Sequence, residues 1–355
     1  MNAARPAAGL ARRVKDLAHA LGFDLAGIAS PEPSPQTERF RSWLARGYAG
    51  EMRWLERRAD ERVDPRLVME GVRSVVCVGL VYDPGARPEP RPGFARISRY
   101  AGGDDYHDVM LEQIEALAAG IEALVQAPVR WRAYVDTGPV LERAIAARAG
   151  LGWIGKNACL VHPRLGSYVF LGVLFTDLAL AFDEPEPDHC GTCRACLDAC
   201  PTAAFAEPGV VDSRRCLSYT TIELREAIPG ELREGQGAHV FGCDVCQDVC
   251  PFNRRERRRV PADPLGLRAR LEQREPWVAP DLAWLLGLDE EAWRAATRRR
   301  ALRRAKYRAL LRNALVAAGN SGEPRLAALV RRFAGGADEL LAEHARWALA
   351  RLGAA

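Results

Sequence analysis

The chain has 355 residues, a net charge of +4 and 48% hydrophobic residues. These values are ordinary for a soluble protein and leave room for two or three domains, each with its own core. No apolar run is long enough to cross a bilayer, and no apolar stretch follows Arg12 and Arg13. We therefore expect no membrane partner and no export signal, which favours the cytoplasm.

The N-terminal block, residues 1–183, mixes helical and strand patterns. An amphipathic helix is predicted over 14–21, where Gly22 ends it, and a longer helix is predicted over 108–125. Apolar segments predict strands at 25–29, 74–82 and 129–135, and one long strand or a hairpin at 167–180. The mixture predicts a multidomain α+β protein whose N-terminal domain is of the α/β type.

The middle block, residues 184–260, contains eight of the ten cysteines, seven of them in two runs. The first run, C-x2-C-x2-C-x3-C-P, starts at Cys190. The second starts at Cys243 and lacks a leading cysteine, because Val240 stands in that position. Such runs wrap 4Fe–4S clusters, and the fourth thiolate of each run binds the other cluster. Cys216 is the nearby spare that restores the count to eight.

The cysteine spacing therefore predicts a bacterial-ferredoxin-like module with two 4Fe–4S clusters. One cluster is assigned to Cys190, Cys193, Cys196 and Cys250. The other is assigned to Cys200, Cys216, Cys243 and Cys246. Zinc sites are the alternative, but zinc uses isolated C-x2-C pairs and does not require a trailing Cys-Pro. Clusters need reduced thiols, which the cytoplasm maintains. The two remaining cysteines, Cys77 and Cys159, are interpreted as small buried apolar residues.

The C-terminal block, residues 261–355, is predicted to be helical, and segments 325–333 and 337–352 suggest a HEAT-like helix pair. Between positions 253 and 312, Arg and Lys outnumber Asp and Glu by more than two to one, which points to an anionic partner. A run of arginines lies at 254–259. Four arginines recur every four residues and are predicted to line one helical face: Arg300, Arg304, Arg308 and Arg312.

Several longer strings carry a resemblance to a known family. They are GEM-x-WL-x-R at 50–57, ISRYA-x-G-x-DYH at 97–107, VDTGPVLER at 135–143, AGLGWIGK at 149–156, RCLSY at 215–219 and TIE at 221–223. With the cysteine runs, they make the chain resemble epoxyqueuosine reductase over nearly its whole length. Gly138, where many relatives carry alanine, and Asn157-Ala158 are small departures from the family pattern.

The resemblance implies an oxidoreductase that reduces epoxyqueuosine to queuosine at the wobble position of a tRNA anticodon. It also implies cobalamin as a cofactor beside the two clusters, and we expect an external low-potential electron donor and a monomer. A protein that binds cobalamin base-on supplies a histidine through Asp-x-His-x-x-Gly, whereas here Met110 stands at the glycine position after His107. The resemblance therefore implies base-off binding.

Removal of an epoxide oxygen as water requires an acid within about 3 Å of that oxygen. Asp136 is the candidate, because it follows an apolar strand directly and precedes a Thr-Gly-Pro turn. In a desolvated pocket its pKa is expected to be raised, so that the carboxyl group is protonated at neutral pH. The alternative is that Asp136 caps a helix that begins near Pro139. The family motif favours the acid.

The remaining site candidates rest on the resemblance and each has a structural alternative. Arg57, Arg99 and Lys156 are candidate contacts of the corrin or of the tRNA backbone, although a lone cation is commonly a solvated charge. Lys156 is one of three lysines and ends a G-x-G-x-x-G string, which we interpret as a backbone turn close to a bulky ligand. The other candidates are Tyr106 and His107 in the cofactor pocket, and Ser218 and Asp244 between cluster and corrin.

Arg300, Arg304 and Arg308 are the candidate tRNA contacts, because a line of arginines can follow a phosphate backbone. The alternative is that these arginines form a solvated face without a partner. Two other functions remain open from the sequence. A cobalamin-dependent reductive dehalogenase would predict an export signal and no basic C-terminal region. A ferredoxin-like electron carrier would leave residues 1–180 without a role.

Overall fold

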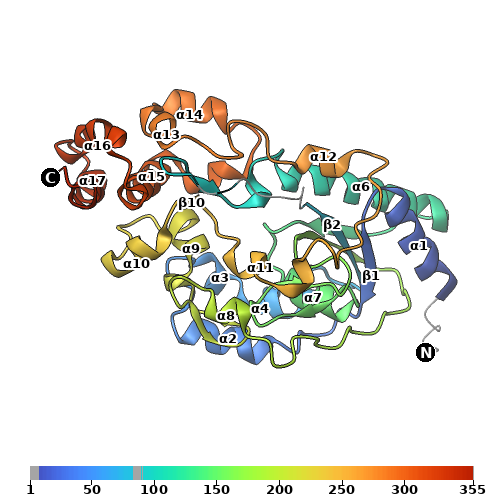
Figure 1. The fold of residues 1–355 in the computed structure, drawn as a ribbon. Coiled ribbons are helices and arrows are strands. Elements are labelled where there is room, and N and C mark those ends of the chain that lie inside the picture. The colour runs from blue at the N-terminus through green and yellow to red at the C-terminus, as the bar shows by residue number, and fades with distance from the viewer. Residues whose placement is uncertain (1–7, 83–88, 90, 355) are drawn as a thin grey trace.

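The computed structural model describes residues 8–82, 89 and 91–354, and its centre is a four-stranded antiparallel sheet in the order β1-β2-β7-β4 (Figure 1). The strands are β1 (Leu25–Ala29), β2 (Ser74–Val81), β7 (Val169–Thr176) and β4 (Trp131–Tyr134). The predicted buried strand at 74–82 is confirmed, since every residue of β2 is buried. The segment at 167–180 forms one strand and not a hairpin.

Both faces of the sheet are covered, which explains the unbroken apolar run of β2. Val76, Val78 and Leu80 pack with α1 (Ala8–Ala20) and α6 (Tyr106–Val125) on one face. Val75 and Cys77 pack on the other face with α7 (Glu142–Arg148). Alternate side chains of a strand point to opposite faces, so a strand with two covered faces is apolar throughout. The sheet thereby fixes the end of β4, where Asp136 follows.

Short elements surround the sheet. Between β1 and β2 lie α2 (Thr37–Ala45), α3 (Trp54–Arg57), α4 (Ala59–Val63) and α5 (Pro65–Val68). After β2 come β3 (Arg96–Ile97) and the 3-10 turn η1 (Arg99–Ala101). After α7 a small hairpin follows, formed by β5 (Trp153–Ile154) and β6 (Leu160–Val161).

The cysteine-rich segment is built from short helices and strands. Its elements are α8 (Ala195–Asp198), β8 (Phe205–Glu207), β9 (Val210–Val211), η2 (Ser213–Arg215), α9 (Leu217–Ile222), α10 (Gly230–Gln236), β10 (His239–Phe241), α11 (Val245–Asp248) and η3 (Pro251–Asn253). Helices α8 and α11 each lie within one cysteine run and pack against each other. Strand β10 pairs in parallel with β3, which joins this segment to the N-terminal block.

The C-terminal segment is helical, as predicted; its last helices lie at the opposite end of the molecule from α1, whereas its first lies beside α6 (Figure 1). Its elements are α12 (Leu267–Leu271), α13 (Leu282–Gly287), α14 (Glu290–Ala296), η4 (Ala301–Ala305), α15 (Tyr307–Ser321), η5 (Pro324–Leu326), α16 (Ala327–Ala334) and α17 (Glu339–Arg351). The helices from α13 onward share one core with Ile97, Ile222 and Phe241, whereas Leu267 and Leu271 of α12 pack in the core of the N-terminal block. No helix in the described part of the chain is long and apolar enough to span a membrane.

Candidate active site and cluster-binding sites

Asp136 follows β4 after a single residue and has a left-handed backbone, with φ of 58°. Positive φ is uncommon for a residue other than glycine and occurs preferentially at functional sites. The alternative that Asp136 caps a helix is wrong, because α7 begins at Glu142 and has Leu141 at its N-cap. The side chain of Asp136 is 69% exposed. The turn therefore presents the carboxylate outward and does not use it to close a helix.

His107 lies between two carboxylates. Its Nδ1 atom is 2.6 Å from Oδ1 of Asp105, and its Nε2 atom is 3.5 Å from Oδ2 of Asp136. Asp105 also caps α6, since its side chain accepts the backbone N–H of His107. Burial alone would lower the pKa of His107, but the contacts with Asp105 and Asp136 outweigh burial and raise that pKa to about 9. His107 is therefore protonated at neutral pH.

The expectation of a raised pKa for Asp136 is wrong in this structure. The ion pair with His107 lowers the pKa of Asp136, and it outweighs the opposing effect of desolvation. Tyr106 and the cation of Arg304 act in the same direction. At neutral pH the proton that we expected on Asp136 is therefore carried by the imidazole ring of His107. Aspartate and histidine together form one proton-holding unit.

Aromatic rings hold this unit from one side. Tyr106 stacks on His107 with ring centroids 4.0 Å apart, and on Phe170 of β7 with centroids 4.2 Å apart. Tyr100 meets Tyr106 edge to face at 5.9 Å. Burial and the nearby carboxylate of Asp136 raise the pKa of Tyr100. The rings fix the imidazole plane, so that His107 keeps its contact with Asp136.

Sequence reasoning missed the second carboxyl group near Asp136. Glu142, in the first turn of α7, has a pKa of about 7, raised by burial and by the charge of Asp136. Its Oε1 atom and the Nε atom of Arg62 are buried and have no hydrogen-bond partner among the described residues. Arg62 donates to the carbonyl oxygen of Gly138, 3.2 Å away. The sequence did offer one signal for Glu142, because this residue lies in the VDTGPVLER string together with Asp136.

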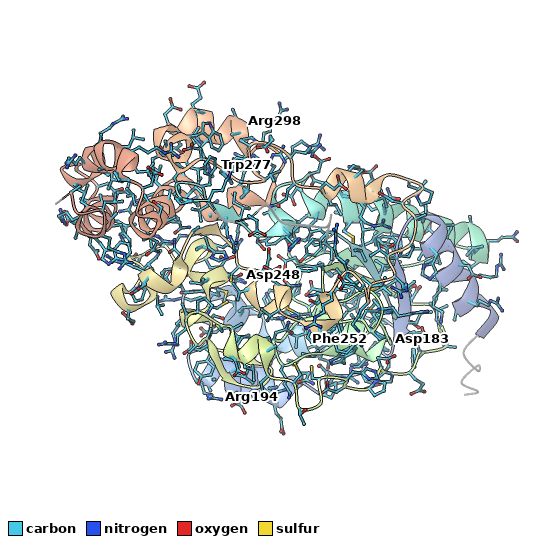
Figure 2. The ribbon with its side chains drawn as sticks, in the orientation of Figure 1. Asp183, Arg194, Asp248, Phe252, Trp277 and Arg298 are labelled. Atoms are coloured by element: carbon cyan, nitrogen blue, oxygen red, sulfur yellow. The ribbon has the colours of Figure 1, made fainter. Side chains whose placement is uncertain are left out.

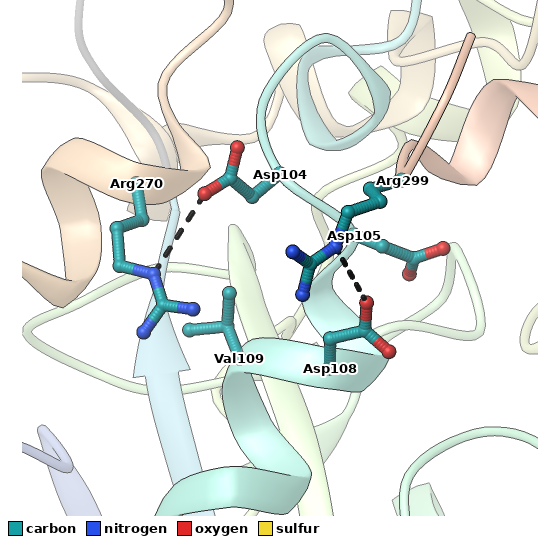
Figure 3. A pocket seen from close by; sticks show the side chains of 6 residues that line it. All are labelled: Asp104, Asp105, Asp108, Val109, Arg270 and Arg299. Carbon is teal, nitrogen blue, oxygen red and sulfur yellow. Dashed lines mark ion pairs between the residues drawn. The ribbon is translucent and has the colours of Figure 1, made fainter.

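A small pocket of about 120 Å³ lies beside Asp105 (Figure 3). It is lined by Asp104, Asp105, Asp108, Val109, Arg270 and Arg299. Arg270 lies 3.7 Å from Asp104, and Arg299 lies 3.9 Å from Asp108. The charges of the pocket are therefore largely paired with one another. Asp105 is the residue that connects this pocket with His107.

The thiols of the two cysteine runs and of Cys216 interact electrostatically within the two predicted sets. Cys196 lies close enough to Cys190, Cys193 and Cys250 for their thiols to interact electrostatically. The thiol of Cys243 interacts in the same way with Cys200 and Cys216. Cys246 interacts with Cys216 and Cys243. Each of these contacts joins members of one predicted group, and the assignment of a cluster to each group stays a prediction.

The two groups differ in exposure. Cys193 is the one exposed cysteine in the described part of the chain. Arg194, the next residue, lies at the edge of the molecule in the view of Figure 2. Cys216, in contrast, is partly buried and accepts hydrogen bonds from the backbone N–H groups of Ser218 and Tyr219. Ser218 therefore lies beside the thiol of Cys216, and its position between cluster and corrin stays a prediction.

Other predicted contacts are engaged within the protein. Lys156 donates its ammonium group to the carbonyl oxygens of Gly191 and Cys193, at 2.6 and 2.9 Å. Arg99 forms an ion pair with Asp248 at 3.0 Å. These side chains hold cluster-binding loops in place, which is a different placement from the corrin or tRNA contact that the sequence suggested.

Asp244 and Arg57 occupy contrasting positions. Asp244 is 1% exposed; it accepts a hydrogen bond from the hydroxyl of Ser98 and another, of 2.9 Å, from the backbone N–H of Arg99. It therefore joins the second cysteine run to η1. Arg57 is exposed at the end of α3.

The prediction of one arginine-lined helical face is wrong. Lys306 has φ of 63° and separates η4 from α15, so the four arginines do not share a helix. Arg300 donates to the carbonyl oxygens of Gly102 and Gly103. Arg312 is fully buried.

The two exposed arginines of that set have separate partners. Arg304 forms a two-pronged ion pair with Glu223, in which its Nε and Nη2 atoms lie 2.9 Å from the carboxylate oxygens. Its guanidinium also lies 4.9 Å above the ring of Trp54. Arg308 pairs with Asp338 at 2.6 Å. Arg304 is therefore the member of the set that lies near Asp136.

Two family models match the chain. One, described as "4Fe-4S double cluster binding domain", matches residues 189–253. The other, described as "Epoxyqueuosine reductase QueG, DUF1730", matches residues 62–137. The first contains all eight cysteines of the two groups, and the second ends one residue after Asp136. The two models thus cover the thiol groups and all of the Asp105–His107–Asp136 unit.

Curated proteins and solved structures agree with these matches. Epoxyqueuosine reductase of Gloeobacter violaceus is 48% identical over 88% of this chain and 97% of its own length. The Pseudomonas aeruginosa protein of the same name is 43% identical over 98% of this chain and 95% of its own. A crystal structure of epoxyqueuosine reductase with an epoxyqueuosine-modified tRNA-Tyr stem loop superposes with a TM-score of 0.86 at 26% identity, covering 97% of this chain and 90% of that one.

Proposed function

Because this chain belongs to the epoxyqueuosine reductase family, we propose that it reduces epoxyqueuosine to queuosine at the wobble position of a tRNA anticodon. The observation that carries the proposal is the Asp105–His107–Asp136 unit, which holds a proton beside an exposed carboxylate in a fold that also groups eight thiols. The reaction removes the epoxide oxygen as water and leaves a carbon–carbon double bond. It consumes two electrons and two protons.

The donor set fits two 4Fe–4S clusters. Four thiols gather in each of two regions, and soft thiolates are the ligands that iron–sulfur clusters use. We assign Cys190, Cys193, Cys196 and Cys250 to the first cluster. We assign Cys200, Cys216, Cys243 and Cys246 to the second. The exposure of Cys193 supports the first cluster as the entry point for electrons from an external low-potential donor.

The residues around Asp136 also fit a cofactor that carries many amide groups, as cobalamin does. The buried, unpartnered atoms of Arg62 and Glu142 would be satisfied by hydrogen bonds to such a ligand. His107 is engaged by two carboxylates, which supports base-off binding. When bound, cobalamin supplies a low-valent cobalt that can deliver electrons to the epoxide carbon. Tyr106 and His107 would flank it, with Asp136 facing the substrate.

Proton delivery is the part of the reaction that this chain performs directly. His107 holds a proton at neutral pH, and Asp136 lies between His107 and the open side of the unit. A proton passed from the imidazole through the carboxylate can reach the departing oxygen, and Asp136 then acts as the immediate proton donor. Glu142, whose pKa is about 7, is placed to supply the second proton.

Recognition of tRNA would use the cationic surface near this unit. A wobble base reaches a buried reaction centre only when it is splayed out of its stack, and aromatic side chains commonly receive such a base. Trp54 is 38% exposed and lies under the guanidinium of Arg304. Arg303, Arg304, Lys306 and Arg308 are exposed on the same segment. We therefore place the anticodon contacts on 303–308, with Arg300 in a supporting position.

We also infer the domain organisation from these roles. Residues 1–183 form the cobalamin-binding and catalytic domain, 184–260 the ferredoxin-like domain and 261–355 a HEAT-like, tRNA-contacting domain. The packing of α17 against both α15 and α16 supports the helical assignment, although Leu267 and Leu271 pack in the N-terminal core. A cytoplasmic monomer is the form in which thiolate clusters and tRNA would meet.

The test compares Asp136→Asn with the unchanged protein, both purified without oxygen. We expect the variant to retain iron, sulfide and corrin and to lose deoxygenation of epoxyqueuosine tRNA by at least about 100-fold, the usual contribution of a positioned acid. A variant of near-normal activity would remove Asp136 from the reaction.

A further inference from the structure

The hairpin of residues 153–161 contacts the loops of both cysteine groups, and the reaction described above gives it no role. Strands β5 and β6 pair Trp153 with Val161 and Ile154 with Leu160. The turn between them is closed by a 2.9 Å hydrogen bond from the backbone N–H of Gly155 to the carbonyl oxygen of Cys159. This hairpin contains Lys156, the lysine that the sequence analysis singled out.

Three contacts join the hairpin to the first thiol group. The indole N–H of Trp153 donates to the sulfur of Cys190 at 3.4 Å. A Cβ atom added to Gly155 would lie 3.6 Å from the same sulfur, so the backbone approaches it closely. The ammonium of Lys156 donates to the carbonyl oxygens of Gly191 and Cys193. A cation and a sulfur-directed donor thus face one cluster site.

The contacts with the second thiol group are of a different kind. Asn157 donates to the carbonyl oxygen of Cys246 at 3.4 Å, and the thiol of Cys159 forms a hydrogen bond with the thiol of Cys246. Neither contact brings a cation to the second group. Through these contacts the hairpin brings positive charge to the first cluster site and not to the second.

Reduction adds one negative charge to a 4Fe–4S cluster. Hydrogen bonds to the ligating sulfurs and nearby positive charge stabilise the reduced form, and they raise the reduction potential. We propose that Lys156 and Trp153 are positioning residues that raise the reduction potential of the cluster held by Cys190, Cys193, Cys196 and Cys250. This exposed cluster would then accept electrons readily from the external donor. The inference rests on the proposed function only for the direction of electron flow.

The experiment is a potentiometric titration followed by electron paramagnetic resonance, without tRNA. Lys156→Met should make reduction of the first cluster about tenfold less favourable, which corresponds to a potential about 59 mV lower for one electron. Trp153→Phe should lower the same potential, and Lys156→Arg should retain it. The second cluster should be unchanged in all three variants. A Cys193→Ala variant, which loses the first cluster, assigns the signals.

Lys15→Met is the matched control, because Lys15 pairs with Asp183 and not with a cysteine loop. It should shift neither potential. Unchanged or raised first-cluster potentials in both Lys156→Met and Trp153→Phe would overturn the proposal. Should Lys156→Met fail to assemble the cluster, Trp153→Phe decides alone. The readout needs no turnover, so loss of the proposed reaction and loss of this inference are distinguishable.

Discussion

Replacing Asp105 by asparagine should move the pH dependence of the reaction without removing the reaction. The Asp105 carboxylate lies 2.6 Å from Nδ1 of His107 and is one of two charges that raise the pKa of His107 to about 9. Asparagine keeps the capping interaction at the start of α6, because it is as good an N-cap as aspartate. The helix should therefore remain intact, and the change should remove charge alone.

The size of the effect follows from the strength of a charged hydrogen bond. Such a bond contributes about 1.5–3 kcal/mol, and each pKa unit corresponds to 1.36 kcal/mol, so the pKa of His107 should fall by roughly one to two units. His107 serves as the proton source only when protonated, so activity is present below its pKa and lost above it. At pH 8.5, a drop of the pKa from about 9 to about 7.5 lowers the protonated fraction from roughly three quarters to about a tenth.

Single-turnover rates of pre-reduced enzyme from pH 6 to 10 provide the assay. The alkaline limb of the variant should lie one to two units lower, with near-equal rates at pH 6. Asp108→Asn is the control, because it removes a carboxylate from the first turn of α6. Asp108 is 59% exposed, and its ion pair is with Arg299, 3.9 Å away. An alkaline limb that stays in place, or that moves equally in the control, would refute the assignment of the proton to His107.

Three further outcomes test separate parts of the account. Asp136→Asn should abolish turnover while the clusters and corrin remain, as metal analysis and absorbance would show. Arg303→Gln with Lys306→Gln should weaken tRNA binding and flatten its salt slope by about one unit per lost phosphate contact, as titrations at several salt concentrations would show. Arg312→Met should lower the free energy of unfolding by about 3–5 kcal/mol, measured by denaturant titration, because it leaves the carbonyl oxygens of residues 220, 224 and 226, the first two of them buried, without their donor.

The tRNA-binding and stability variants each have a control on the same chain. Arg12→Gln, on the exposed side of α1, should leave the salt slope of tRNA binding unchanged. Arg308→Met removes an exposed ion pair with Asp338 and should cost less than about 1 kcal/mol of stability. An equal salt slope in Arg12→Gln and in the double variant would contradict the tRNA contact and show that the 303–308 segment is a solvated surface. A stability loss in Arg312→Met no larger than in Arg308→Met would contradict the structural role of the buried guanidinium.

Local sequence patterns predicted the parts of the molecule that depend on local spacing. The cysteine runs predicted the 4Fe–4S double cluster domain that the family model finds at 189–253, because ligand spacing is set by the cluster itself. The apolar run at 74–82 gave β2. Asp136 was found because a strand end and a Thr-Gly-Pro turn are adjacent in sequence.

Features that depend on distant contacts could not be predicted in this way. The proton lies on His107 and not on Asp136, because α6 and the end of β4 meet only in the folded chain. The regular spacing of arginines failed as a helical face, because Lys306 takes a positive φ between η4 and α15. Lys156 was noticed as unusual, but its partners lie 35 and 37 residues away in the cluster loop.

The central claim is tested most directly by analysing the nucleosides of tRNA after reaction with this protein. The account holds that anaerobic protein containing iron, sulfide and corrin, supplied with a low-potential reductant, converts epoxyqueuosine in the tRNA to queuosine with loss of one oxygen atom per molecule, as mass spectrometry would detect. Unconverted epoxyqueuosine after incubation with fully loaded, reduced protein would contradict it.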